Sequence, residues 1–192
     1  MIVKRGEKSH TAMRSDAFAN VSRIVAAARQ VFATGDGDSL NHIAKVAGVG
    51  IATLYRHFPN RESLARAAYD DIFTTEVEPL IAEFARTDAP RDALLNVAER
   101  LYEIILREKG LVASLGNVTE ETTALLAGCA ETLTPLLRKA QEAGNVRADL
   151  DPEDLPYLIA MIVAALSAVA VDGDRRRRYL GFLLDALKPP VH

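Results

Sequence analysis

Residues 39–61, SLNHIAKVAGVGIATLYRHFPNR, decide the fold of this 192-residue chain. From residue 40 to residue 47 the apolar side chains recur every three or four positions, which is the spacing of one face of a helix. Gly48 predicts the end of that helix, because a sharp turn needs a backbone angle that glycine adopts at the least cost. A second helix, over roughly residues 50–57, is too short to be stable without neighbours. Two short helices joined by a glycine turn are typical of a helix-turn-helix.

The second short helix carries polar and basic side chains that its own packing does not need. Leu54 and Phe58 can turn toward the rest of the domain, which leaves hydrogen-bonding and cationic groups for the major groove of DNA. Pro59 predicts the end of this helix, and Asn60 can cap the next one. The free amides at that helix start, together with Arg61, would suit a phosphate. The pattern therefore indicates DNA binding.

The same stretch resembles the DNA-binding motif of the TetR family of bacterial transcriptional regulators. The family pattern has an alanine in the first helix, Gly-Val at the turn and Thr-Leu-Tyr in the second helix. An aromatic residue follows, and then a basic residue that opens the next helix. In this chain those positions hold Ala44, Gly48, Val49, Thr53, Leu54, Tyr55, Phe58 and Arg61. The resemblance implies a ligand-responsive transcriptional regulator, which we interpret as a repressor that binds a palindromic operator as a dimer.

The resemblance also implies which side chains meet double-stranded DNA. These are Asn41, Ile51, Ala52, Thr53, Tyr55, Arg56, His57 and Arg61. Four of them can donate to phosphates and position the domain: Thr53, Tyr55, His57 and Arg61. Arg56 and Asn41 are long or amide-bearing enough to read base edges. Ile51 and Ala52 can pack on a thymine methyl group, but they leave few side chains for base reading.

Composition predicts an all-α protein. The chain is 49% apolar and has 11 Gly and 8 Pro, with no run of alternating apolar and polar residues bounded by turns. Its single cysteine, Cys129, excludes an internal disulfide and a cysteine-cluster metal site. Residues 1–15 are polar and basic, unlike a signal peptide, so we expect a cytoplasmic protein. Residues 155–171 carry no charge, but they are at the lower limit for a membrane span and contain Pro156, so we expect no membrane insertion.

Charge divides the chain into a basic head and an acidic body. Residues 1–61 carry nine Lys or Arg and four acids, a net charge of +5, so the remainder carries −8 of the total of −3. We expect a flexible basic arm at 1–15, a three-helix DNA-binding domain at 16–62, and a helical ligand-binding and dimerisation domain at 63–192. The arm is either a frayed terminus or a contact to the adjacent minor groove.

Start and stop signals place the remaining helices. We expect helices at about 16–34, at 61–86 with a kink near 76–78 caused by Pro79, and from Pro90 to a stop at Gly110. A short element at 111–115 should lead to one long helix from Thr119 toward Ala143, bent at Pro135. Asp151-Pro-Glu-Asp154 predicts the start of the 155–171 helix, and the last helix runs from about Arg175 to Leu187.

The last two helices predict a dimer interface. A helix that is apolar all round must be buried all round, which a single small body can hardly achieve. The last helix adds an apolar stripe of Leu180, Leu183, Leu184 and Leu187. We therefore expect a homodimer through residues 155–187, in which two helices per subunit form a four-helix bundle. The basic run at 175–178 is either a solvated turn paired with Asp172 and Asp174 or a nucleic-acid contact.

The sequence predicts no catalytic site, metal site or cofactor. The four histidines have no ligand at the spacing of a helical metal site, and residues 35–37 lack the rest of a phosphate-binding loop. By analogy with the family, a pocket for a small-molecule effector would lie in the body. Its candidate residues are Phe84, Tyr102, Asn117, Thr122, Cys129 and Met161, for each of which core packing is the alternative. A helical interaction module, or a regulator without an effector, remains the alternative function.

Overall fold

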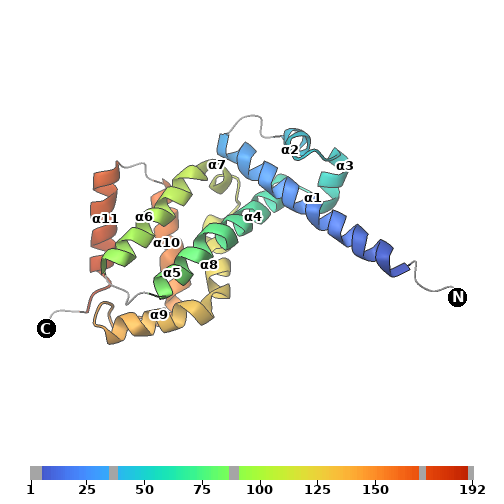
Figure 1. Ribbon diagram of the computed structural model, residues 1–192. Helices are drawn as coiled ribbons and strands as arrows, with labels where there is room; N and C mark the ends of the chain where they lie inside the picture. The colour runs from blue at the N-terminus through green and yellow to red at the C-terminus, as the bar shows by residue number, and fades with distance from the viewer. Residues whose placement is uncertain (1–5, 35–38, 87–90, 169–171, 190–192) are drawn as a thin grey trace.

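The computed structural model describes residues 6–34, 39–86, 91–168 and 172–189. Regular structure in these ranges is helical, so the expected all-α fold is confirmed (Figure 1). The elements are α1 (Gly6–Thr34), α2 (Leu40–Ala47), α3 (Ile51–His57), α4 (Arg61–Ile72), the π-helical η1 (Phe73–Val77), α5 (Glu78–Ala85), α6 (Arg91–Arg107), α7 (Lys109–Val112), α8 (Val118–Gly128), α9 (Ala130–Glu142), the 3-10 helix η2 (Pro152–Asp154), α10 (Leu155–Ala168) and α11 (Gly173–Asp185).

The helix-turn-helix has the predicted boundaries. The Ser39 side chain caps α2 by accepting from the His42 backbone N–H at 3.2 Å. Gly48 ends α2 with φ at 64°, in the left-handed region, which confirms the predicted turn. Behind α3, the Asn60 side chain accepts from the Ser63 backbone N–H at 2.7 Å and so caps α4 as expected.

The first helix is longer than the sequence predicts. α1 begins at Gly6 rather than near Asp16, so residues 6–15 of the expected arm are part of this helix, and residues 1–5 lie outside the described residues. The N-terminal half of this helix lacks the apolar periodicity that our reading required, since it extends away from the other helices (Figure 1).

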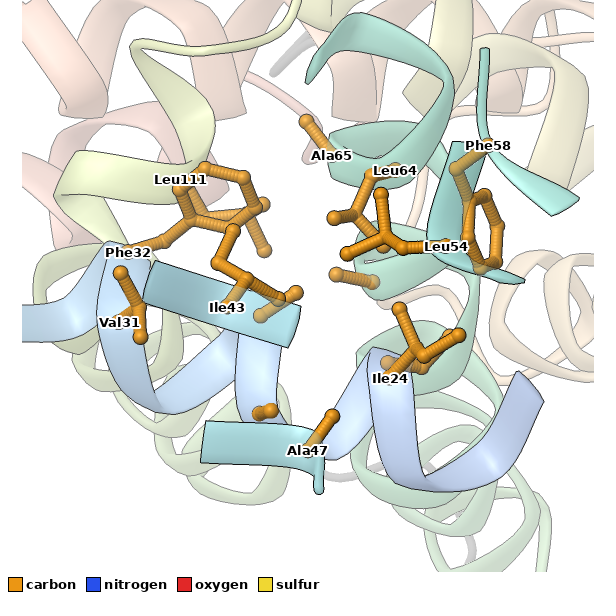
Figure 2. Packing of buried hydrophobic residues seen from close by; sticks show 14 of the residues in the cluster. Ile24, Val31, Phe32, Ile43, Ala47, Leu54, Phe58, Leu64, Ala65 and Leu111 are labelled. Carbon is orange, nitrogen blue, oxygen red and sulfur yellow. The ribbon is translucent and has the colours of Figure 1, made fainter. Parts of the chain in front are cut away.

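One apolar cluster joins the helix-turn-helix to its supports. Ile24 of α1, Ile43 of α2, Leu54 of α3 and Leu64 of α4 are completely buried and point into a common interior (Figure 2). Leu111 of α7 enters the same cluster. The short helices α2 and α3 therefore pack in one cluster with α1, α4 and α7, and these neighbours supply the stability that two short helices lack alone.

The predicted kink near Pro79 takes the form of a π-helical turn. The Glu78 backbone N–H donates to the carbonyl of Phe73, five residues back, before α5 continues the same path. Pro79 has no N–H and its ring would clash with a regular preceding turn, and the wider turn relieves that clash. The result is a bulge between α4 and α5, where the head meets the body.

The helix stop predicted at Gly110 is wrong because a tertiary contact decides it. α6 ends at Arg107, and Gly110 lies inside α7, where a Cβ atom would stand 2.1 Å from the Phe32 carbonyl oxygen of α1. Gly110 therefore permits a close approach of two helices rather than a stop.

The long helix expected from Thr119 to Ala143 is two helices. Asn117, not Thr119, caps the first of them, α8, and the chain breaks at Gly128 and Cys129, whereas Pro135 lies within α9. The break lets α8 pack against α10 while α9 turns to pack against α5. A single straight helix could not cover both partners.

α10 follows its predicted start signal, whereas α11 begins at Gly173, slightly before the expected Arg175, because the Asp172 side chain caps it. Asp151 and Asp154 form a capping box around η2, and α10 begins at Leu155. α10 is described as far as Ala168; the predicted continuation to Val171 lies outside the described residues. Among the described helices, none has the length and apolarity that crossing a membrane requires.

Candidate nucleic-acid interface and body cavity

The exposed face of α2 and α3 carries most of the predicted DNA contacts. Asn41, Ala52 and Arg56 are exposed, and Tyr55 and Ile51 are 50% and 36% exposed. Thr53 is partly buried. Because Leu54 and Phe58 fill the opposite side of α3, this helix presents one face to solvent, at the end of the molecule away from α9 and α11 (Figure 1).

Two predicted contacts are directed into the protein. The Arg61 guanidinium donates to the Ser114 hydroxyl at 2.9 Å and lies 4.7 Å from the centre of the Phe32 ring. In this structure Arg61 therefore joins α4 to α1 and to the segment after α7, and its contact with DNA stays a prediction. His57 is half-buried, and its Nε2 is enclosed without a hydrogen-bond partner.

Lys45 is a candidate contact that our sequence reading missed. It is exposed on α2 and lies one helical turn after Asn41, on the same face. The four-residue spacing between a polar and a basic side chain could have identified it.

The basic run on α11 makes contacts within the protein. Arg177 pairs with Glu99 of α6 at 2.5 Å, and Arg175 with Asp172 at 3.4 Å. The Arg176 guanidinium lies 4.4 Å from the centre of the buried Tyr102 ring. The Arg176 and Arg177 contacts join α11 to α6, and only the Arg175–Asp172 pair is one that the first reading of this run expected.

A cavity of about 220 Å³ lies inside the body. Side chains from α4, η1, α5, α6, α8, α9 and α10 line it, and nearly all of them are apolar. Two of the six predicted pocket residues, Phe84 and Thr122, are among them. The Tyr69 and Thr122 hydroxyls share a hydrogen bond of 2.6 Å, and burial raises the pKa of Tyr69.

The other four predicted pocket residues do not line this cavity. Tyr102 of α6 is buried beneath the Arg176 guanidinium of α11, and Asn117 is the cap of α8. Cys129 lies at the break between α8 and α9, where burial raises the pKa of its thiol, and Met161 is 55% exposed. Our prediction of these residues rests on their being polar or aromatic and lying in apolar helices. That criterion does not separate residues that line a cavity from residues that cap a helix or pack elsewhere.

A cluster of charged side chains joins α1 to the helices that line the cavity. Arg29 of α1 pairs with Asp71 at 2.9 Å and with Glu76 at 2.5 Å. Arg107 pairs with Glu76 at 2.5 Å and with Glu108 at 2.9 Å. Burial alone would raise the pKa of Glu76, but the hydrogen bonds from the two arginines outweigh it and hold that pKa below its ordinary value.

Glu108 belongs both to this cluster and to the cavity wall. It is only 5% exposed and lines the cavity beside Leu101 and Ile104. Our sequence reading missed it, although residues 101, 104 and 108 follow the three- and four-residue spacing of one helix face. A carboxylate in line with the apolar Leu101 and Ile104 could have identified Glu108 as a residue of the cavity wall.

α10 and α11, which both pack against α6, each expose large apolar side chains. Tyr157, Met161 and Phe182 are 62%, 55% and 61% exposed, and Tyr179 and Leu183 are 41% and 43% exposed. Leu180 and Leu187, two members of the predicted stripe, pack within the subunit instead. Of the predicted stripe, Leu183 is therefore part of the exposed apolar surface, together with Tyr179 and Phe182.

Two family models match the chain. Residues 24–68 match the bacterial regulatory proteins of the tetR family, and residues 89–189 match the SbtR-like transcriptional regulator C-terminal domain. A curated relative, the HTH-type transcriptional regulator SAR0097 of Staphylococcus aureus (strain MRSA252), is 36% identical over 102 residues. That match covers 50% of this chain and 52% of the relative, so our chain spans about half the length of the curated protein.

Solved structures match over most of the chain. A TetR transcription regulatory protein from Mycobacterium vanbaalenii is 31% identical with a TM-score of 0.53, over 92% of this chain and 99% of that one. The regulator SCO0520 from Streptomyces coelicolor is 30% identical with a TM-score of 0.55, over 89% and 99%. RolR in complex with resorcinol has a TM-score of 0.72 at 20% identity, over 92% and 91%, and shows likeness of fold.

Proposed function

This chain belongs to the TetR family of bacterial transcriptional regulators, and from that premise we propose that it is a repressor that binds a palindromic operator as a homodimer and releases it in response to a small molecule. The observation that carries this proposal is the exposed face of α3, held in place by α1, α2 and α4 with Tyr55 and Arg56 directed outward. A regulator of this kind would work on chromosomal DNA in the cytoplasm.

DNA recognition would be divided among the exposed side chains. We propose that Tyr55, Thr53 and Lys45 contact phosphates, that Arg56 and Asn41 read base edges, and that Ile51 and Ala52 pack on the bases. His57 and Arg61 have partly buried positions and would contribute mainly by shaping the domain. The proposed DNA-binding domain spans residues 16–62, with α1 reaching further toward the N-terminus.

Dimerisation would use the apolar surface of α10 and α11. Five large apolar side chains are exposed there, and burying them between two subunits would be favourable. Two heads on one face of B-DNA would then stand about 34 Å apart, or a multiple of that distance, which suits a palindrome.

Effector response would use the cavity in the body. Phe73 and Val77 of η1 line the cavity, while Glu76 of the same turn holds Arg29 of α1. A ligand that favours one arrangement of this turn would therefore change the position of α1 and of the head. The RolR complex named above contains resorcinol, and for our chain this supports the idea only through the shared fold.

The experiment that tests the proposal is selection of bound fragments from genomic DNA, followed by measurement of affinity. Arg56→Ala should lose about 1–3 kcal/mol on the selected operator and much less on random DNA, if Arg56 reads a base edge. Arg138→Ala, a change of an exposed arginine on α9, is the matched control and should leave both affinities unchanged. A helical interaction module would instead show no salt-dependent binding to any fragment.

A further inference from the structure

Glu108, in the cavity wall, has a carboxylate group whose hydrogen bonding is incomplete. Glu108 is 5% exposed, and its Oε2 atom is buried without a hydrogen-bond partner. Both neighbouring arginines approach the other oxygen, Oε1: the Arg107 Nε at 2.9 Å and the Arg29 Nη2 at 3.8 Å. A buried carboxylate oxygen without a donor is rare in folded proteins and costly to leave unsatisfied.

The charges around Glu108 do not cancel. Asp71, Glu76 and Glu108 contribute three carboxylates, and Arg29 and Arg107 contribute two guanidinium groups. The cluster therefore carries one net negative charge beside a cavity whose remaining walls are almost entirely apolar. A hydrogen-bond donor or a positive charge would be stabilised at Oε2, and a carboxylate or phosphate would be repelled.

The remaining walls set the size and polarity of the partner. At about 220 Å³ the cavity is smaller than the roughly 300–1,000 Å³ that is usual for drug-sized ligands, which favours a molecule of one or two rings. The hydroxyls of Tyr69 and Thr122 already bond to each other, and the Thr122 hydroxyl also donates to the Val118 carbonyl at 2.7 Å. Glu108 is therefore the principal polar anchor that the cavity offers.

We propose that Glu108 is the specificity-determining residue of the effector site, and that the effector is a small, mainly apolar molecule with one hydrogen-bond donor, a hydroxyl or a protonated amine, bound to the Glu108 Oε2. This inference rests on the proposed role of the cavity as the effector site. An apolar cavity by itself would predict only an apolar ligand. Glu108 adds the requirement that the ligand carry a hydrogen-bond donor.

Four naphthalene derivatives test the inference by isothermal titration calorimetry on the full chain at pH 7. They share one ring system and differ in one group: 2-naphthol, 2-(aminomethyl)naphthalene, 2-methylnaphthalene and 2-naphthoate. A donor on Oε2 should make the naphthol or the amine bind about tenfold or more tightly than the methyl compound, with naphthoate the weakest. Equal affinities for all four, or no binding by any of them, would overturn the inference.

Variants at position 108 assign the preference to Glu108. Glu108→Met removes the acceptor at similar length, so the preference for the donor should disappear while 2-methylnaphthalene binds as before. Glu108→Gln keeps an acceptor without the charge, so it should keep a preference for the naphthol but lose that for the amine. Glu103→Met, which changes an exposed carboxylate on α6, one turn before the end of that helix, should change nothing.

Two outcomes separate this inference from the proposed function. If Glu108→Met folds and keeps the donor preference, the assignment to Glu108 is refuted even though the cavity binds ligand. If Glu108→Met does not fold, Glu108→Gln alone decides, because an amine preference that survives the loss of charge contradicts the role proposed for the carboxylate. Operator binding, measured in parallel without probe, tests the DNA-binding proposal independently.

Discussion

Substitution of Gly110 by alanine should loosen the contact between the body and the DNA-binding head. A Cβ atom at this position would stand 2.1 Å from the Phe32 carbonyl oxygen and 3.2 Å from the Phe32 carbonyl carbon. Both obstacles are backbone atoms near the end of α1, so no side-chain rotation can relieve the clash. α7 would have to move by roughly 1 Å to restore an ordinary contact distance.

That movement would disturb the first core cluster. Phe32 and Leu111 are 1% and 0% exposed, and both pack in this cluster. Overpacking of this kind costs about 1–3 kcal/mol, whereas alanine in place of glycine in a helix would otherwise gain about 0.5–1 kcal/mol. We therefore expect Gly110→Ala to lower the free energy of unfolding by about 1–2 kcal/mol.

Equilibrium urea unfolding at one fixed protein concentration measures this loss as a lower midpoint with an unchanged slope. Gly128→Ala is the matched control, because Gly128 is also helical and nothing lies within 4 Å of its added Cβ. It should be neutral or slightly stabilising. A Gly110→Ala variant as stable as the wild type, or as stable as Gly128→Ala, would refute the close approach of α7 to α1.

Three further perturbations test the other contacts. Arg61→Ala should lower the free energy of unfolding by about 1–2 kcal/mol, because it removes the Phe32 stacking and a hydrogen bond; unchanged stability with a smaller salt slope of DNA binding would instead make Arg61 a phosphate contact. Glu76 has a folded-state pKa below its ordinary value of 4.5, so its stabilising contribution is present above that pH and is lost as the pH falls through the folded-state pKa. Urea unfolding from pH 7 to acid should therefore show a smaller loss for Glu76→Gln than for the wild type, and equal losses would contradict this. Phe182→Asp on α11 should convert the dimer to a monomer in analytical ultracentrifugation. Leu106→Asp, at an exposed apolar position on α6, is the control and should leave the dimer intact. A Phe182→Asp variant that remains dimeric would exclude the apolar surface of α10 and α11 as the dimer interface.

The predictions that held depend on residues close together in the chain. Ser39 and Gly48 bound α2, Asn60 caps α4, and Asp151 opens η2, each through bonds to backbone groups within a few residues. Such caps need no distant partner, so their residue types and spacing suffice to locate them. The helix-turn-helix, and with it the family resemblance, is built from signals of this kind.

The candidate DNA-binding surface was predictable in position but not in the use of every side chain. Tyr55 and Arg56 are exposed as expected, because Leu54 occupies the buried side of the short α3. Arg61 is the exception: its partners, Phe32 and Ser114, are far from it in sequence. Helical periodicity indicates which face a residue occupies, but not which long side chain bends back to a distant partner.

The sequence by itself determined the all-α class, the helix-turn-helix and the starts of α2, α4 and α10, because these follow from local backbone bonding and from the spacing of apolar residues. Tertiary structure alone decided that Gly110 is a point of close approach, that the chain breaks at Gly128, and that Glu108 lies at an apolar cavity with one oxygen unpaired. Each of these features depends on helices that meet only after folding, and on the small volume left between them. The shape of that volume, and the charge beside it, are properties of the packed helices together rather than of any one segment.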